Sequence, residues 1–472
     1  MGIRELYEAS KQHALFRHFD RLNNDQKLEF EKNLDEIATK NAPETLLQDC
    51  QKAIELSSAN SDETDAIEPL PNTSYGTCVG NPELEEEYRD LGLQEVHNGR
   101  VAVVLMAGGQ GTRLGSSQPK GCYDIGLPSK KSLFQIQAEK LICLQKLAKS
   151  PHPIPWYIMT SKPTRGPTEQ FFQENNYFGL APSQIVFFNQ GTLPAFDLEG
   201  KQLLLESPTQ LVESPDGNGG LYRAIRDNGI LDDLVARKIK HIHMYCVDNV
   251  LVKLADPVFI GYALKNGFEL ATKAVPKRDA AESVGLIVSK NGAPSVVEYS
   301  EISKKMAEAT DKNGLLKFRA ANIVNHYYSV DLLQRELGSW CTSMPYHIAK
   351  KKIAVYDNSA DSIYKPTEAN GIKLEQFIFD VFPKMDMNKF GCLEVDRTAE
   401  FSPLKNAPGT ANDNPETSRV AYLELGTKWL KAAGAEVGSK SLVEVPGTLS
   451  YGGESLERYK GQAFSEQLSI LH

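Results

Sequence analysis

The strongest constraint on the fold of this chain is a short apolar run followed at once by a glycine-rich loop. Residues 101–115 read V-A-V-V-L-M-A-G-G-Q-G-T-R-L-G, and Pro119 and Lys120 follow. The run 101–106 has no polar residue, which is typical of a strand buried on both faces of a parallel sheet. The glycines after it let backbone amides approach a ligand closely. Together with the cations Arg113 and Lys120, the loop predicts a polyphosphate site.

Two other phosphate-binding loops do not match this stretch. A dinucleotide loop has the pattern G-x-G-x-x-G, but after Gly109 and Gly111 the next glycine, Gly115, comes one residue too late. A Walker A loop needs four residues between its first glycine and G-K-[ST], and neither this loop nor G-L-P-S-K-K-S at 126–132 has that spacing. A tight turn with solvated surface cations is the structural alternative.

The stretch L-M-A-G-G-Q-G-T-R-L-G-S-S-Q-P-K-G resembles the signature of the eukaryotic UDP-N-acetylglucosamine pyrophosphorylases, L-x-G-G-x-G-T-R-L-G followed by P-K. Later motifs extend the resemblance to about residue 420, and more loosely to both termini. It implies an α/β fold with a Rossmann-like nucleotidyltransferase core and a mixed central sheet. We expect a mostly helical N-terminal domain at 1–95, a central catalytic domain at 96–394 and a small C-terminal domain at 395–472.

The pattern along the chain supports an alternation of strands and helices, which is typical of a doubly wound sheet. Residues 1–57 have apolar residues at helical spacing, and 57–74 has the composition of a linker. Further predicted helices cover 132–148, 221–227 and 372–382, and predicted strands cover 156–160, 185–188 and 242–247, with period-two segments from Phe268 onward.

Composition excludes several classes of protein. The 472 residues carry a net charge of −9, and nucleic-acid binding proteins have a basic face instead. We find no apolar run of membrane-spanning length and no secretory signal. Seven scattered cysteines without a C-x-x-C pair fit a reducing, cytoplasmic setting. His241, His243 and Cys246 alternate like metal ligands, but the segment is better explained as a core strand. The sequence leaves the oligomeric state open, and we expect a monomer.

The resemblance implies a specific reaction, in which UTP and N-acetylglucosamine 1-phosphate give UDP-N-acetylglucosamine and pyrophosphate. An oxygen of the sugar phosphate attacks the α-phosphorus of UTP. Positioning and charge neutralisation supply most of the catalysis in such phosphoryl-group chemistry, so no protein nucleophile is needed. Mg²⁺ is the expected cofactor.

Three cations are the expected catalytic groups, and one carboxylate is the expected metal ligand. The resemblance assigns Arg113 to the β- and γ-phosphates of UTP, Lys120 to the α-phosphate and Lys405 to the sugar phosphate. We expect Lys405 to arrive from a mobile C-terminal segment that closes over the site. Asp248 follows a predicted buried strand, where a carboxylate faces the ligand crevice and could hold Mg²⁺. A turn-capping aspartate is the alternative.

The resemblance also assigns substrate-binding residues. The expected nucleotide-binding residues are Met106, Ala107, Gly108, Gly109, Gln190, Gly217, Asp248 and Lys373. The expected sugar-binding residues are Asn218, Glu298, Tyr299, Asn322, Phe377 and Phe379. Glu298 is predicted within a strand, where an unpaired carboxylate makes a poor core residue. For Phe377, core packing is an equal alternative, because it shares an apolar stripe with Leu374 and Val381.

Three other functions remain to be distinguished. The first keeps the chemistry and changes the sugar, to glucose 1-phosphate, N-acetylgalactosamine 1-phosphate or a broad range. The second is a metal-dependent glycosyltransferase that consumes UDP-sugars, although such enzymes commonly carry D-x-D and this chain has Val247-Asp248-Asn249. The third is a non-catalytic nucleotide-sugar sensor, which would not need four charged groups at the phosphates.

Overall fold

The computed structural model describes residues 2–58, 66–357 and 360–471. These residues form two compact units, each made of segments that are distant in sequence. The first unit comprises Met1–Asp65, Gln190–Arg223 and Ser339–Asp380, and the second comprises Ala66–Asn189, Ala224–Gly338 and Val381–His472. These units do not coincide with the consecutive stretches 1–95, 96–394 and 395–472, which remain our prediction of domains.

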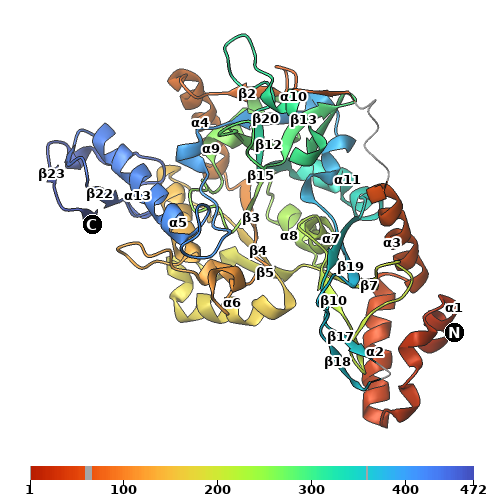
Figure 1. The fold of residues 1–472 in the computed structure, drawn as a ribbon. Coiled ribbons are helices and arrows are strands. Elements are labelled where there is room, and N and C mark those ends of the chain that lie inside the picture. The colour runs from red at the N-terminus through yellow and green to blue at the C-terminus, as the bar shows by residue number, and fades with distance from the viewer. Residues whose placement is uncertain (1, 59–65, 358–359, 472) are drawn as a thin grey trace. The chain divides into compact units, whose positions relative to one another are not determined.

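The first unit packs three helices against short strands (Figure 1). Its helices are α1 (Ile3–Ala9), α2 (Asn24–Lys40) and α3 (Pro43–Ser58). Its strands are β6 (Thr192–Pro194), β7 (Phe196–Asp197), β8 (Leu205–Ser207), β9 (Gln210–Leu211), β10 (Glu213–Pro215), β16 (His347–Lys351), β17 (Val355–Asp357), β18 (Ser362–Tyr364) and β19 (Gly371–Glu375). They pair in the order β16–β19–β7 and as the hairpins β10–β6, β8–β9 and β17–β18.

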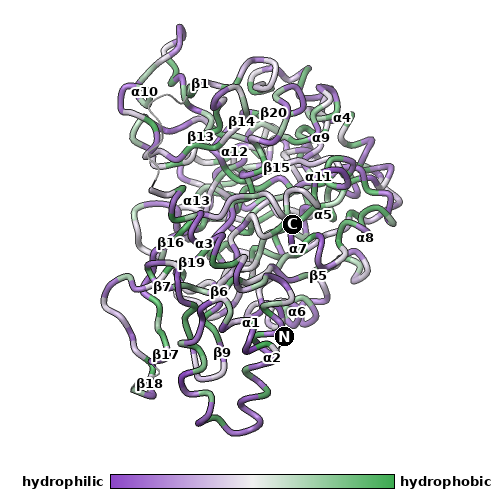
Figure 2. The backbone as a smooth tube through the Cα atoms, turned by 90° about the vertical axis from the view of Figure 1, so that its right-hand side faces the viewer, coloured by the Kyte–Doolittle hydropathy of each residue, from purple (hydrophilic) through white to green (hydrophobic). Residues whose placement is uncertain are grey.

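The helices of the first unit are amphipathic, as their sequence predicts. Hydrophobic and hydrophilic residues alternate along α2 (Figure 2), whose Phe30 and Leu34 are fully buried. These side chains belong to one hydrophobic cluster with Phe196 and Ile372 of the strands. The predicted helical character of residues 1–57 is confirmed. Of the predicted linker 57–74, residues 59–65 lie outside the described residues.

The second unit contains a mixed sheet of eleven strands. Its main path runs β2 (Tyr75–Thr77), β20 (Phe390–Glu394), β12 (Leu270–Pro276), β15 (Ala320–Ser329), β11 (His241–Cys246), β3 (Val101–Met106), β4 (Trp156–Thr160) and β5 (Ile185–Asn189), with β1 (Ile67–Glu68), β13 (Leu286–Lys290) and β14 (Ala293–Val297) beside it. Strand β15 is antiparallel to both of its neighbours on this path, whereas β11, β3, β4 and β5 are parallel to one another. The predicted α/β class with a mixed central sheet is confirmed.

Helices and further strands complete the second unit. The helices are α4 (Pro82–His97), α5 (Leu133–Leu147), α6 (Lys162–Glu174), α8 (Ile230–Ala236), α9 (Pro257–Asn266), α10 (Lys304–Glu308), α12 (Arg397–Glu400) and α13 (Pro415–Ala432). The last strands are β21 (Glu436–Val437), β22 (Leu442–Glu444), β23 (Ala463–Phe464) and β24 (Leu468–Ile470). Two helices, α7 (Gly220–Asp227) and α11 (Val330–Ser343), contribute residues to both units. In the part of the chain that the structure describes, no helix combines the length and the apolar character needed to cross a membrane.

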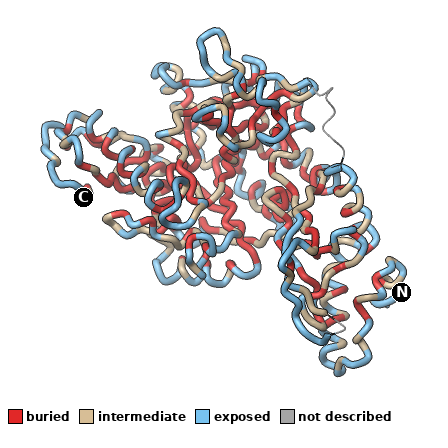
Figure 3. Tube along the Cα trace, viewed as in Figure 1, coloured by how far each residue is buried: buried red, intermediate tan, exposed pale blue. Residues whose placement is uncertain are grey.

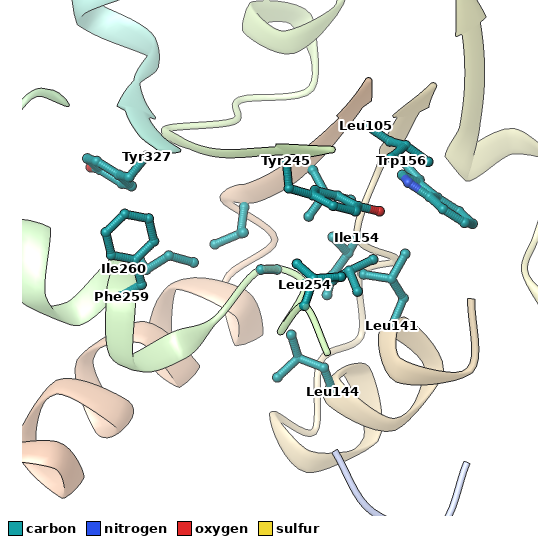
Figure 4. Packing of buried hydrophobic residues seen from close by; sticks show 14 of the residues in the cluster. Leu105, Leu141, Leu144, Ile154, Trp156, Tyr245, Leu254, Phe259, Ile260 and Tyr327 are labelled. Atoms are coloured by element: carbon teal, nitrogen blue, oxygen red, sulfur yellow. The ribbon is translucent and has the colours of Figure 1, made fainter. Parts of the chain in front are cut away.

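The large sheet has a buried centre formed by β3, β4 and β11, and the tube in Figure 3, viewed as in Figure 1, is mostly red in this region. All six residues of β3 are buried, as the apolar run predicts. Leu105 of β3, Trp156 of β4, Tyr245 of β11 and Leu141 of α5 share one hydrophobic cluster (Figure 4). Helix α5 begins where the sequence predicts, because the Ser132 hydroxyl accepts a hydrogen bond from the Gln135 amide at 3.2 Å.

One predicted element is wrong. Residues 372–382 form the strand β19 and the 3₁₀ segment η8 (Ile378–Lys384) instead of an amphipathic helix. Strand β19 lies between β16 and β7, and its residues alternate between buried Ile372 and Leu374 and the less buried Lys373. Pairing with strands that are distant in sequence therefore overrides the local helical spacing.

Candidate functional site

The glycine-rich loop leaves the carboxyl end of β3 and is closed by its own backbone. The Ala107 amide donates to the Met159 carbonyl at 2.8 Å, which carries the sheet pattern one residue past the strand. Further along, the Gly111 amide donates to the Gln118 carbonyl at 3.0 Å, and the Lys120 amide donates to the Gly109 carbonyl at 3.2 Å. Gly109 itself is exposed. The loop is thus held as a closed curve with accessible backbone at its tip.

The loop carries two cations in different settings. Arg113 lies in the 3₁₀ turn η3 (Thr112–Leu114) and is exposed, while its neighbour Leu114 is buried in a cluster with Val250 and Leu404. Among the residues that the structure describes, Arg113 has no ion-pair partner. Its guanidinium is therefore available to an anion.

Lys120 meets Asp248 at the edge of the sheet. Their Nζ and Oδ2 atoms are 3.6 Å apart, and both side chains are about four-fifths buried, with exposures of 17% and 22%. Parallel pairing of β3 with β11 sets Met106 opposite Cys246, so the chain segments that follow the two strands emerge side by side. The structure therefore brings Lys120, predicted on the phosphate loop, close to Asp248, predicted at the carboxyl end of a buried strand.

Lys405 reaches the same edge through backbone hydrogen bonds. The Leu404 amide donates to the Asp248 carbonyl at 2.8 Å, and Asn249 and Pro403 form a β-bridge. Burial and the Asp248 carboxylate raise the pKa of the Cys246 thiol, while the positive charges of Lys405 and Lys120 act in the opposite direction. Two lysines and one carboxylate therefore influence the charge state of the Cys246 thiol.

The sequence pattern predicts Cys246 only as part of a core strand. Its place two residues before Asp248 was the available signal that it borders the charged edge. The imidazole rings of the neighbouring histidines have protein partners. His241 contacts the Tyr327 hydroxyl and Glu95, and His243 accepts from the Ala255 amide and contacts Asn325, which confirms the interpretation of this segment as a core strand.

Glu298 and Asn322 both lie close to Gly285. The Asn322 amide donates to the Gly285 carbonyl at 2.9 Å, and a Cβ placed on Gly285 would lie 3.5 Å from Oε1 of Glu298. Glu298 lies one residue beyond β14 and is exposed, which corrects the prediction that it lies within a strand. Exposed Tyr299 lines an adjacent cavity of about 370 Å³.

In the first unit, a second glycine-rich loop, S-P-D-G-N-G-G at 214–220, packs on the segment that follows β19. The Gly219 amide donates to the Gln376 carbonyl at 2.8 Å, and the Asn218 side-chain oxygen accepts from the Ile378 amide at 2.9 Å. Gly217 has φ +86°, and a Cβ there would lie 2.4 Å from the Gln376 oxygen. These glycines permit a close backbone approach, which ties Asn218 to the segment bearing Phe377.

Phe377 and Phe379 form a half-buried aromatic surface in the first unit. Their rings stack at 5.2 Å, and the ring of His347 stacks on Phe377 at 4.4 Å. His347 is held by Asp380, whose carboxylate also accepts from the Phe377 amide at 2.8 Å. Neither phenylalanine is fully buried, so Phe377 is only partly packed against the protein and keeps part of its surface exposed. Sequence reasoning missed His347 and Asp380, because no motif links residues from two separate segments.

The predicted site residues belong to both units. Lys373 lies half-buried on β19, and Gln190 directly follows β5 and is half-buried. The first unit contains Gln190, Gly217, Asn218, Lys373, Phe377 and Phe379. The second unit contains Met106, Ala107, Gly108, Gly109, Arg113, Lys120, Asp248, Glu298, Tyr299, Asn322 and Lys405.

Comparisons with known proteins agree with one another. The model of the UDPGP family, described as UTP--glucose-1-phosphate uridylyltransferase, matches residues 48–410. The chain is 63% identical over 471 residues to the UDP-N-acetylglucosamine pyrophosphorylase of Saccharomyces cerevisiae, and the aligned region covers 99% of each chain. It is 43% identical over 424 residues to UDP-N-acetylglucosamine diphosphorylase 2 of Arabidopsis thaliana, covering 86% of this chain and 82% of that one. The crystal structure of the uridine diphosphate N-acetylglucosamine pyrophosphorylase from Trypanosoma brucei in complex with inhibitor matches with a TM-score of 0.83 and 28% identity, covering 97% of this chain and 93% of that one.

Proposed function

Because the chain belongs to the UTP--glucose-1-phosphate uridylyltransferase family, we propose that it joins UTP and N-acetylglucosamine 1-phosphate into UDP-N-acetylglucosamine and pyrophosphate. The observation that carries this proposal is the convergence of Lys120, Asp248 and the segment bearing Lys405 at the carboxyl ends of β3 and β11. A site that brings two polyanions together needs this concentration of positive charge. The names of the relatives in yeast and Arabidopsis favour the N-acetylated sugar over glucose.

The chemistry is a displacement at the α-phosphorus. A phosphate oxygen of the sugar forms a bond to this phosphorus, and the bond from it to the oxygen that bridges to the β-phosphate breaks. The leaving pyrophosphate takes up the electron pair. In our proposal Lys120 neutralises the α-phosphate, Arg113 holds the β- and γ-phosphates, and Lys405 holds the incoming sugar phosphate.

Asp248 is the proposed ligand of Mg²⁺. Within the described part of the chain, no group of three His, Cys, Asp or Glu side chains could hold a metal ion. A single, mostly buried carboxylate beside a phosphate loop nevertheless fits Mg²⁺, which takes one or two carboxylates and completes its shell with phosphate oxygens and water. When bound, the ion would neutralise phosphate charge.

The remaining assignments belong to the same proposal. In the first unit, the stacked rings of Phe377 and Phe379 offer an apolar surface suited to the methyl of an acetyl group. Glu298, Tyr299 and Asn322 offer carboxylate, hydroxyl and amide groups for sugar hydroxyls. A cytoplasmic location is supported by the seven cysteines, because none of them forms a disulfide bond in the described part of the chain. We propose a monomeric enzyme.

The test is incubation with UTP, Mg²⁺ and a panel of sugar 1-phosphates, followed by detection of pyrophosphate and of the nucleotide sugar. We expect the highest kcat/KM with N-acetylglucosamine 1-phosphate, and loss of activity with EDTA that added Mg²⁺ restores. A strong preference for glucose 1-phosphate would overturn the choice of sugar. Release of UDP instead of pyrophosphate would identify a glycosyltransferase, and turnover that persists under EDTA would contradict the role of Asp248.

A further inference from the structure

Asn249 connects the two chain segments that carry Asp248 and Lys405. Its side chain is buried, with 4% exposure. Its Nδ2 donates to the Glu400 carbonyl at 2.7 Å, and its Oδ1 accepts from the Ser402 amide at 3.0 Å. One amide side chain thus satisfies a carbonyl and an amide of the segment 400–405, which is more than 150 residues away in sequence.

The same oxygen of Asn249 also fixes the loop in which it lies. Oδ1 accepts from the Leu251 amide at 3.2 Å, a local turn of the kind that asparagine favours. The backbone continues the connection, because the Val250 amide donates to the Ser402 carbonyl at 3.1 Å. The loop after β11 and the segment before Lys405 therefore form one hydrogen-bonded layer.

A buried ionic cluster anchors the far end of this segment. Glu400 pairs with Lys273 of β12, which is fully buried, and with Lys253 at 3.4 Å. Lys273 also pairs with Asp256, so two cations face two carboxylates. The cluster fixes where the segment starts, and Asn249 fixes its course from Glu400 towards Lys405.

We propose that Asn249 is a positioning residue that holds Lys405 beside Asp248 and Lys120. This inference rests on the proposed function, in which Lys405 binds the sugar phosphate. Both polar atoms of the Asn249 side chain are engaged by the protein backbone, so we assign this residue a positioning role and no contact with substrate. In this proposal, Asn249 fixes the position of Lys405 before the substrate binds. This matters because displacing a reacting group by about 1 Å costs on the order of 100-fold in rate.

The first experiment compares Asn249→Ala with Gln184→Ala. Gln184 is also a buried amide, with 2% exposure, and its side chain donates to the Ile154 carbonyl at 2.7 Å and accepts from the Ala181 amide. It lies before β5, at the amino end of the strand, and serves as the control for lost stability. We expect Asn249→Ala to lower kcat/KM for the sugar 1-phosphate about 100-fold, with the dissociation constant of UTP unchanged. Gln184→Ala should keep wild-type kinetics.

The second experiment is a double-mutant cycle with Lys405→Ala. If Asn249 acts through Lys405, the double variant should be about as slow as Lys405→Ala alone. Hydrogen exchange gives a readout that does not depend on activity. The amides of Ser402 and Leu404 should exchange about tenfold faster in Asn249→Ala but not in Gln184→Ala. Should Asn249→Ala fail to fold, Asn249→Ser keeps a hydroxyl for the Leu251 amide and loses the bonds to the distant segment.

The outcomes separate this inference from the proposed function. An active wild-type chain whose Asn249→Ala variant matches Gln184→Ala in kcat/KM would overturn the inference alone. Multiplicative losses in the double variant would do the same, because they would show that Asn249 acts independently of Lys405. A wild-type chain that releases no pyrophosphate with any sugar 1-phosphate would overturn the proposed function, and the inference with it.

Discussion

At the scale of single residues, the ion pair of Lys120 and Asp248 is suited to binding a charged ligand. Its 3.6 Å separation and partial exposure make its contribution to stability small, on the order of 1 kcal/mol or less. A phosphate group could therefore compete for Lys120 at little cost to the fold. The exposed Arg113, on the same loop, adds a second cation.

Replacing Lys120 tests this function directly. We expect Lys120→Ala to lower kcat by about 100- to 1,000-fold, because a fixed charge that stabilises the transition state is lost. Its unfolding midpoint should stay close to that of the wild type. The matched control is Lys265→Ala, which removes an ion-paired lysine at the end of α9. Wild-type kcat in a folded Lys120→Ala variant would remove this lysine from the mechanism.

At the scale of elements, the backbones of α4 and α9 are in direct contact at two glycines. A Cβ on Gly92 of α4 would lie 2.0 Å from the Pro257 carbonyl oxygen, and a Cβ on Gly261 of α9 would lie 1.9 Å from the Tyr88 oxygen. Each helix thus presents a glycine to the backbone of the other. Any side chain at these positions would force the helices apart.

We therefore expect Gly261→Ala to destabilise the protein by about 2–3 kcal/mol, the usual cost of overpacking a rigid contact. Urea unfolding followed by circular dichroism would measure this change. Gly166 of α6 provides the control, because a Cβ there meets nothing within 4 Å. Gly166→Ala should leave stability unchanged or raise it by up to about 1 kcal/mol. Equal effects of the two substitutions would contradict the packing argument.

Local patterns predicted most elements but not β19. Buried Ile372 and Leu374 with less buried Lys373 between them follow a period of two, which also fits part of a helical stripe over such a short range. Residues 371–375 form a strand because they pair with β16 and β7, which flank β19. The start of helix α5 could be predicted without a distant partner, because its capping residue Ser132 bonds to the amide of Gln135, three residues later in the sequence.

At the scale of the whole molecule, the central sheet buries histidines in neutral form. The Nδ1 of His243 accepts from the Ala255 amide, so Nε2 carries the proton and donates to Asn325 at 2.6 Å. Burial, together with the nearby charge of Lys273, lowers the pKa of His243 to about 4. Burial lowers the pKa of His326 on the neighbouring strand to about 3.

These pKa values predict how stability depends on pH. The unfolded chain takes up protons on histidine below about pH 6.5, whereas the folded chain does not until about pH 4, so acid favours unfolding. We expect the free energy of unfolding to be constant near pH 7.5 and to fall between pH 6.5 and 4.5. The slope should approach about 1.4 kcal/mol per pH unit for each of the two histidines.

Urea unfolding at several pH values would measure this slope, and the exposed His152→Gln variant should not change it. The carboxylates whose pKa is lowered, such as Asp256 and Glu282, add their effect only below about pH 4.5, where they protonate in the unfolded chain. A free energy of unfolding that is flat from pH 7 to pH 5 would contradict neutral burial.

Local sequence patterns predict the buried strand 101–106, the phosphate loop after it and the charged residues that follow strands, because each of these features involves residues close together in the chain. The predicted roles of Arg113, Lys120 and Asp248 come from the same local patterns and from the family resemblance. Three other features could be found only in the folded protein: the hydrogen bonds from Asn249 to the segment of Lys405, the stacking of His347 on Phe377, and the strand at residues 371–375. In each of these cases the partner is distant in sequence, so the interaction exists only once the chain has folded.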